Sequence, residues 1–141
     1  PDMKPYEIVE HTAEIGIRAY GRTRKELFAH MAQGMFGLIV PSEEVKKRSS
    51  HSVRATAEGG ERLLVAWLRE LLFLFDTTHF LGCTFEIRGL TENKLEAKVS
   101  GEKLDHRRHH VDKEVKAVTY CDLFMERGAD GIWSAQVIFD I

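Results

Sequence analysis

The acidic residues near the two ends of the chain are the first candidates for chemistry. Glu14 stands at the entrance to a predicted strand, directly after the segment His11-Thr12-Ala13, and Asp140 ends the last predicted strand beside Ile141. If the first and last strands are neighbours, both side-chain carboxylates approach the α-carboxylate of Ile141. Carboxylates this close repel one another unless a cation or shared protons are present, and oxygen-only ligands favour Ca²⁺ or Mg²⁺ over Zn²⁺. The residues alone leave two interpretations open, a cation site and two solvated surface acids.

Three histidines form a second candidate region. His106, His109 and His110 flank Arg107 and Arg108 within a polar segment, residues 102–112. This pattern is compatible with a phosphate-facing patch or a transition-metal site. It is more typical of a solvated loop whose histidines respond mildly to pH. We therefore predict a solvated loop here.

Other side chains that could react favour structural roles. His79 and Cys83 are four residues apart, but they lie at a predicted helix end, where this spacing no longer places them on one face. Trp67 and Trp133 have apolar neighbours in the sequence and are predicted core residues. Two roles stay open for His11: it could donate a ring N–H to a neighbouring carboxylate and orient it, or it could bond to backbone groups.

The composition is that of a soluble globular protein. The 141 residues are 43% hydrophobic and 30% charged, which suits one domain spanning residues 1–141. The formal net charge of -2 argues against broad electrostatic capture of nucleic acid but leaves room for a small basic patch. No apolar leader is visible, and the most apolar run, residues 63–75, contains Arg69 and Glu70 and is too short to span a bilayer. We expect a cytoplasmic protein.

The two cysteines, Cys83 and Cys121, lie far apart and belong to no metal-binding or redox motif. Isolated cysteines usually behave as small hydrophobic side chains. We predict two reduced, mostly buried thiols.

Two helices and several strands must position the candidate residues. Thr23 to Glu26 form a capping box, in which the Thr23 hydroxyl accepts a free backbone N–H and Glu26 reaches back to the cap residue. The helix that follows runs to about residue 39, and a second helix over residues 61–75 is so apolar that we predict its burial. Apolar or alternating segments predict strands at 6–9, 15–20, 52–57, 83–88, 94–100, 114–121, 123–127 and 132–139. This order indicates an α+β fold in which two helices pack on a mixed, mostly antiparallel sheet.

Three motifs, by their order and spacing, resemble the archease family. The segment Tyr6 to Gly16 is similar to the family's Tyr-x-x-x-x-His-Thr-Ala-Asp-x-Gly opening. Lys116 to Tyr120 is similar to its Lys-Ala-x-Thr-Tyr strand, and Asp140-Ile141 is similar to the Asp-Ile pair that follows its last apolar strand. Both predicted helices also agree with the family pattern, so the resemblance covers nearly the whole chain.

The resemblance implies a fold, a cation site and a partner. Archeases have an α+β fold and bind a divalent cation, often Ca²⁺, through residues that correspond here to Glu14, Asp140 and Ile141. The family's important lysine corresponds to Lys116, and His11 is a further candidate for partner activation. The implied partner is the RtcB-type tRNA-splicing RNA ligase, whose active-site histidine is guanylylated by GTP. Archease promotes this guanylylation and multiple turnover without joining RNA, so we expect no enzyme activity, contact with RNA only through the ligase, and no membrane association.

Two positions differ from the family pattern. Glu14 stands where Asp is usual, and its extra methylene changes the distance at which it can meet a cation. Cys121 stands where His commonly follows Thr-Tyr. Because the last two residues supply ligands in this hypothesis, a tag fused after Ile141 is expected to impair the protein.

Two other functions remain as alternatives. One is a general chaperone-like modulator of RNA-processing or RNA-modifying proteins, which suppression of unrelated protein aggregation without GTP or ligase would support. The other is a metal-dependent hydrolase that uses Glu14, Asp140 and His11. It is disfavoured because the sequence has no evident nucleophile, glycine-rich phosphate loop or histidine-rich ligand set.

Overall fold

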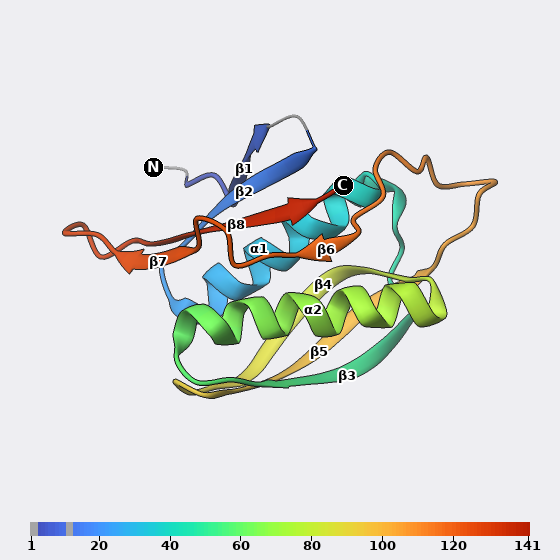
Figure 1. Ribbon diagram of the computed structural model, residues 1–141. Coiled ribbons are helices and arrows are strands. Elements are labelled where there is room, and N and C mark those ends of the chain that lie inside the picture. The colour runs from blue at the N-terminus through green and yellow to red at the C-terminus, as the bar shows by residue number, and fades with distance from the viewer. Residues whose placement is uncertain (1–2, 11–12) are drawn as a thin grey trace.

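The computed structural model describes residues 3–10 and 13–141. The elements in chain order are β1 (Tyr6–Glu10), β2 (Glu14–Gly21), α1 (Arg24–Ile39), the short 3-10 helix η1 (Ser42–Glu44), β3 (Ser49–Thr56), α2 (Gly60–Thr78), β4 (Phe80–Leu90), β5 (Lys94–Lys103), β6 (Ala117–Val118), β7 (Phe124–Arg127) and β8 (Trp133–Asp140) (Figure 1). One sheet has the order β1-β2-β8-β6 with β7 also paired to β8, and the other has the order β3-β5-β4. All described strand pairs are antiparallel.

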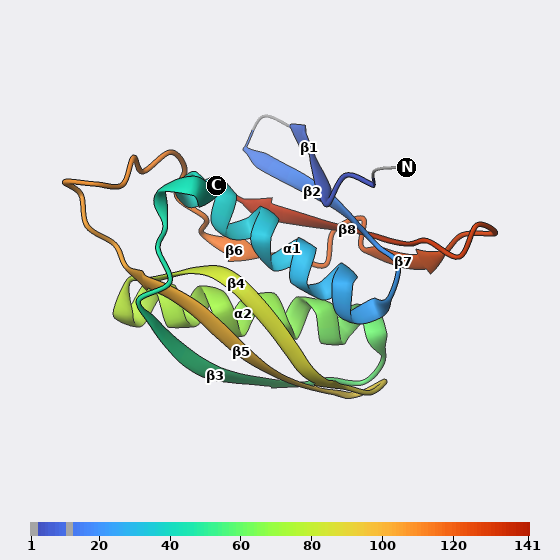
Figure 2. The same cartoon turned by 180° about the vertical axis from the view of Figure 1, so that it is seen from behind.

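Both helices lie between the two sheets (Figures 1 and 2). Helix α1 packs against β2 of one sheet and β4 of the other, and α2 packs against β3 and β6. This position explains why Leu27, Phe28, Met31 and Met35 are all fully buried, since a helix between two sheets has little face left for water. The predicted α+β class is confirmed, but the strands form two sheets where one was predicted.

Helix α1 begins at the predicted cap. The Thr23 hydroxyl oxygen accepts the Glu26 N–H at 3.1 Å, which satisfies one of the unpaired donors of the first turn. The Glu26 carboxylate accepts the Arg22 N–H at 3.0 Å, one residue before the cap residue that the capping-box pattern predicted. Both bonds fix the direction in which the chain leaves β2.

The segment between β5 and β6 closes the other end of α1. The Asp112 N–H donates to the Ile39 carbonyl at 2.8 Å, and the Lys113 N–H donates to the Leu38 carbonyl at 3.0 Å. These bonds satisfy two helix carbonyls that would otherwise lack partners. The predicted strand over 114–121 is therefore wrong for most of its length: Asp112 and Lys113 bond to the helix end, and strand β6 is limited to Ala117–Val118.

Helix α2 extends beyond its predicted bounds at both ends. It follows Gly59, whose φ of 94° suits glycine, and it ends at His79, whose N–H donates to the Phe75 carbonyl at 2.7 Å. Trp67 is fully buried, as predicted, and its indole N–H donates to the Phe28 carbonyl at 3.0 Å. This bond joins the two helices. No helix in the described part of the chain is long and apolar enough to cross a membrane.

Candidate functional site

Glu14 and Asp140 lie directly opposite each other on neighbouring strands. The antiparallel register of β2 and β8 pairs Glu14 with Asp140, and the Ile141 N–H continues the ladder to the Ala13 carbonyl at 3.3 Å. Both acids are half-buried, and directly opposed strand residues have Cβ atoms about 5 Å apart. We call this pair the acidic tip. The register therefore confirms that the first and last long strands, β2 and β8, are neighbours and that the two acids face each other across them.

Lys116 adjoins the acidic tip through the backbone. Its N–H donates to the Asp140 carbonyl at 2.8 Å, and the next residue, Ala117, pairs with Asp140 in the ladder between β6 and β8. Thr119 continues this attachment, because both its N–H and its hydroxyl donate to the Ile138 carbonyl at 3.0 and 2.9 Å. The Lys116 side chain is exposed. An exposed lysine is thus attached through its backbone to the strand end that carries Asp140.

Cys121 lies within the electric field of the acidic tip. The charge of Asp122, the local loss of hydration, and the charges of Glu14 and Asp140 raise the pKa of its thiol, in that order of size. A raised thiol pKa means a negative local potential, because negative charge disfavours the thiolate. Cys121 is exposed and Cys83 is half-buried, and both are free. The prediction of reduced thiols is confirmed, and the prediction that they are mostly buried is wrong.

The donor chemistry of the acidic tip fits a hard divalent cation. Two carboxylates and the main-chain oxygen of Ile141 are oxygen ligands of the kind that Ca²⁺ and Mg²⁺ prefer. Among residues 3–10 and 13–141, no group of three or more His, Cys, Asp or Glu side chains is arranged to hold a metal ion. Main-chain oxygen and water therefore have to complete the coordination of any cation held here. His11, predicted as an activation residue, lies outside the described residues.

Arg69 of α2 holds the short strand β6 in place. Its Nε and Nη2 both donate to the Val118 carbonyl, at 3.2 and 2.9 Å, and its guanidinium carbon lies 4.6 Å from the centre of the Tyr120 ring. Strand β6 has only two residues and pairs with β8 on one side, so this carbonyl depends on Arg69. The signal in the sequence was an arginine in the middle of a mostly apolar helix, and this pattern does not identify the partner of the arginine.

Removing the Arg69 guanidinium is expected to destabilise the fold. Arg69→Gln leaves the carbonyl of the buried Val118 without its donors, at a cost of about 1–2 kcal/mol in the free energy of unfolding. Urea unfolding monitored by circular dichroism measures this. Arg62→Gln is the control, because Arg62 is exposed on the same helix and surface changes of this kind stay within about 0.5 kcal/mol. Equal stability of the two variants would contradict the role given to Arg69.

Comparisons with known proteins decide the family. The sequence pattern of the Archease protein family (MTH1598/TM1083) matches residues 6–141. The archease of Pyrococcus abyssi is 42% identical over 142 residues, covering 99% of this chain and 100% of that protein. The archease of Methanosarcina mazei is 40% identical over 142 residues, covering 98% of this chain and 97% of that protein. The chain belongs to the archease family.

Solved structures agree with this membership. The solution structure of protein 1598 of Methanobacterium thermoautotrophicum superposes with a TM-score of 0.83 at 32% identity, covering 99% of this chain and 100% of that one. A Thermotoga maritima structure, described as that of an archease and possible chaperone, superposes with a TM-score of 0.66 over 100% of this chain and 99% of that one. Its 18% identity shows a shared fold alone.

Glu102 is the buried centre of a polar cluster in this archease-family chain. It is 3% exposed, and it binds the side chains of Arg48, Arg108 and His109. It also accepts the Lys46 N–H at 2.8 Å. We call these residues the Glu102 cluster. A buried carboxylate requires such partners, and here they fasten the segment after β5 to the segment before β3.

His109 has a structural role in this archease. Its Nδ1 accepts the Asp105 N–H at 2.9 Å, so the ring proton lies on Nε2 and is donated to Glu102 at 2.9 Å. His109 is 4% exposed, so the predicted solvated loop is wrong at this residue. His110 is exposed and bonds to Glu44 at 2.8 Å, whereas His106 is simply exposed. The three rings do not form a transition-metal site.

The Glu102 cluster predicts a loss of stability in acid. Burial opposes ionisation of Glu102, but Arg108, the Lys46 N–H and His109 outweigh it and lower its pKa from 4.5 to about 2. Because the unfolded chain takes up this proton first, the stabilisation is complete above pH 4.5 and disappears as pH falls toward 2. We expect a loss of about 2 kcal/mol from this group over that range, measured by urea unfolding at stepped pH. Glu102→Gln should unfold more easily at pH 7, and its free energy of unfolding should vary less with pH than that of the wild type. A variant with the same pH profile as the wild type would show that Glu102 is not responsible for the loss of stability in acid.

The remaining predicted residues lie apart from the acidic tip. His79 ends α2 in a left-handed conformation with φ of 62°, its ring 6.0 Å from that of Phe75, and Cys83 lies in β4. Trp133 is half-buried against the core, in keeping with its predicted role.

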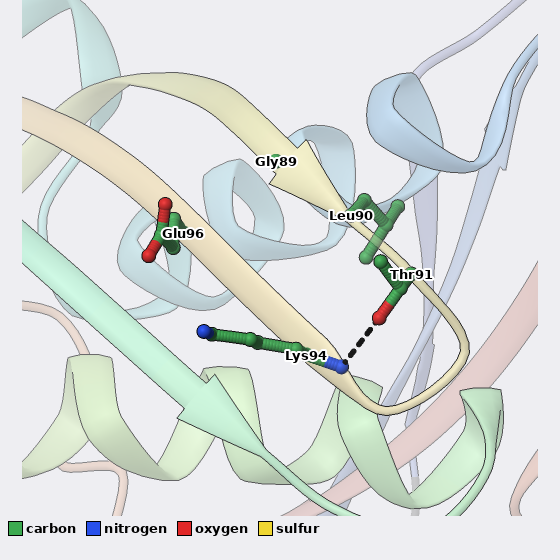
Figure 3. A pocket seen from close by; sticks show the side chains of 5 residues that line it. All are labelled: Gly89, Leu90, Thr91, Lys94 and Glu96. Atoms are coloured by element: carbon green, nitrogen blue, oxygen red, sulfur yellow. Dashed lines mark hydrogen bonds between the residues drawn. The ribbon is translucent and has the colours of Figure 1, made fainter.

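A hollow at the turn between β4 and β5 has no evident chemistry. Gly89, Leu90, Thr91, Lys94 and Glu96 line its volume of about 170 Å³ (Figure 3). The dashed contact in Figure 3 is a turn bond, in which the Lys94 N–H donates to the Thr91 hydroxyl at 3.1 Å. The acidic tip therefore remains the best candidate site.

Proposed function

We propose that this protein is a non-enzymatic activator of an RtcB-type tRNA-splicing RNA ligase. It promotes GTP-dependent guanylylation of the ligase and thereby sustains multiple turnover. The observation that carries the proposal is the register that sets Glu14 against Asp140 in a chain whose pattern matches the archease family over residues 6–141. The proposal extends family membership to a specific partner.

The proposed roles follow from the chemistry of the acidic tip. Glu14, Asp140 and a main-chain oxygen of Ile141 would hold Ca²⁺ or Mg²⁺, and the Lys116 backbone is bonded to Asp140. A bound cation supplies neutralisation of negative charge, which nucleotidyl and phosphoryl transfer require. The ammonium of Lys116 is exposed, so it can attract and orient the phosphates of GTP in the partner's active site. In this proposal the acidic tip contributes charge and the ligase provides the bond chemistry.

Multiple-turnover RNA joining tests the function. We expect a small molar fraction of this protein to raise the steady-state joining rate of the cognate ligase in the presence of GTP and a divalent cation. Lys116→Ala should lower this stimulation by about 10-fold without disturbing the fold, because the Lys116 backbone, and not its side chain, bonds to Asp140. The matched control is Lys98→Ala, an exposed lysine on β5. Equal stimulation by both variants would remove Lys116 from the proposal.

One surface feature favours a second candidate, a chaperone-like modulator of RNA-processing or RNA-modifying proteins. Phe73 and Tyr120 are 65% and 52% exposed, and Arg69 lies one helical turn from Phe73 and over the Tyr120 ring. Exposed aromatic side chains are typical of protein-binding surfaces. Suppression of aggregation of unrelated proteins, in the absence of GTP and ligase, would support this candidate. Dependence of every effect on the ligase would exclude it.

A further inference from the structure

Two segments far apart in the sequence form one basic surface. Residues 43–48 and 102–113 together contain seven lysines and arginines against five acidic residues, in a chain whose net charge is -2. The segments are tied together by several bonds. The Lys46 N–H donates to the Glu102 carboxylate at 2.8 Å, and the His110 N–H donates to the Glu44 carboxylate at 2.7 Å.

Most of the acidic side chains on this surface are already engaged. Glu102 binds two arginines in its cluster, and Glu44 binds His110. Asp105 accepts the Arg107 N–H at 2.9 Å, and Asp112 pairs with Lys113 at 3.5 Å. Their charge is therefore largely compensated within the protein.

Four cations remain available to a ligand. Lys46, Lys47, Lys103 and Arg107 are all exposed, and none forms an ion pair with another of the described residues. Glu43 is the single acid of these two segments without such a pair among the described residues. We call these four residues the free cations. The Lys46 N–H bonds to Glu102, and Lys47, Lys103 and Arg107 are next in sequence to Arg48, Glu102 and Arg108, which are joined by ion pairs, so the backbone positions of the free cations are fixed before any ligand arrives.

The basic surface and the acidic tip lie at the same end of the molecule. The long connection from β5 to β6 extends from the end that carries the C-terminus, and the turn between β7 and β8 lies at the opposite end (Figures 1 and 2). The same connection leads directly into Lys116, which bonds to Asp140. A partner that meets the acidic tip can thus bring a second ligand to the basic surface.

We propose that Lys46, Lys47, Lys103 and Arg107 bind the phosphate backbone of the RNA that the ligase joins. Lysine and arginine side chains without acidic partners attract the phosphate groups of nucleic acids, and this attraction does not depend on base sequence. The inference rests on the proposed function, which identifies the RNA as the substrate of the ligase. It adds a direct contact between this protein and that RNA, whereas the proposed function alone requires only that the ligase holds the RNA.

Salt-dependent binding of the full-length chain to RNA tests the proposal. The probe is a fluorescently labelled single-stranded RNA of about 20 nucleotides, titrated by anisotropy without ligase. Four phosphate contacts predict a slope of log affinity against log salt near about -3, and so an affinity loss of about 50-fold between roughly 50 and 200 mM salt. Lys47→Gln combined with Arg107→Gln should reduce the slope by about half. The matched control, Arg62→Gln combined with Lys98→Gln, removes the same charges from α2 and β5 and should leave the slope unchanged.

Three results would overturn the proposal. One is absence of binding by the wild-type chain at low salt, and another is an equal slope for the two double variants. The third is a Lys47→Gln and Arg107→Gln variant that loses affinity for RNA-free ligase while keeping its RNA affinity, which would assign the surface to the protein partner. Failure of the proposed function looks different: the wild-type chain would bind RNA with the expected slope but leave ligase guanylylation unchanged.

Discussion

Asp140→Asn is expected to remove nearly all stimulation of the ligase. The change deletes one of the two opposed carboxylate charges of the acidic tip, and ligand charge is a main determinant of Ca²⁺ affinity. We expect cation affinity, measured by calorimetric titration with CaCl₂, to fall about 100-fold. Guanylylation of the ligase should fall toward its rate without this protein.

The Asp140 substitution should leave the fold intact. The bonds that hold Lys116 and Ala117 to this position use the Asp140 backbone, and asparagine preserves them. Glu126→Gln is the control, because Glu126 is an exposed acid on β7. Strand β7 pairs with the beginning of β8, away from Asp140 at its end. If Asp140→Asn stimulated guanylylation at the wild-type rate with the complex intact, the acidic tip would not be the functional site.

Gly101→Ala is expected to be the most destabilising glycine-to-alanine substitution in the β3-β5-β4 sheet. A Cβ at Gly101 would lie 1.8 Å from the Leu81 carbonyl oxygen and 3.1 Å from the Gly82 Cα. Both are backbone atoms, so the strands themselves have to move apart. We expect a loss of at least about 3 kcal/mol in the free energy of unfolding, because overpacking against backbone cannot be relieved by a rotamer change.

Gly89→Ala provides a matched comparison in the same sheet. A Cβ at Gly89 would meet only the Glu96 side chain, at 3.8 Å, which is ordinary van der Waals contact. Its stability should stay within about 1 kcal/mol of the wild type, with a small gain from the lower entropy of the unfolded chain. Urea unfolding curves for the two variants measure the difference. Similar midpoints would show that β4 and β5 are not as closely paired at Gly101 as described.

The parts of the fold that depend on local sequence could be predicted. Thr23 and Glu26 defined the start of α1 because capping involves residues only three or four apart. The burial of α2 followed from its nearly continuous apolar composition. Periodicity placed Glu14 at the beginning of one strand and Asp140 at the end of another. The register that pairs the two residues is seen only in the structure.

The parts that depend on distant residues could not be predicted. Glu102 was predicted to begin a polar loop, yet it is buried and binds Arg48 and His109, to which no local sequence pattern connects it. Strand β6 is short because Asp112 and Lys113 bond to the end of α1, a contact across more than seventy residues. The division of the strands into two sheets has the same origin, since periodicity identifies strands without their neighbours.

Guanylylation of the cognate ligase is the measurement that tests the central claim most directly. Transfer of labelled GMP from GTP to the ligase should be followed with and without this protein, in the presence of Ca²⁺ or Mg²⁺. The account predicts faster transfer with wild-type protein and no acceleration with Asp140→Asn. An unchanged rate with wild-type protein, when the two proteins form a complex under the same conditions, would contradict the account.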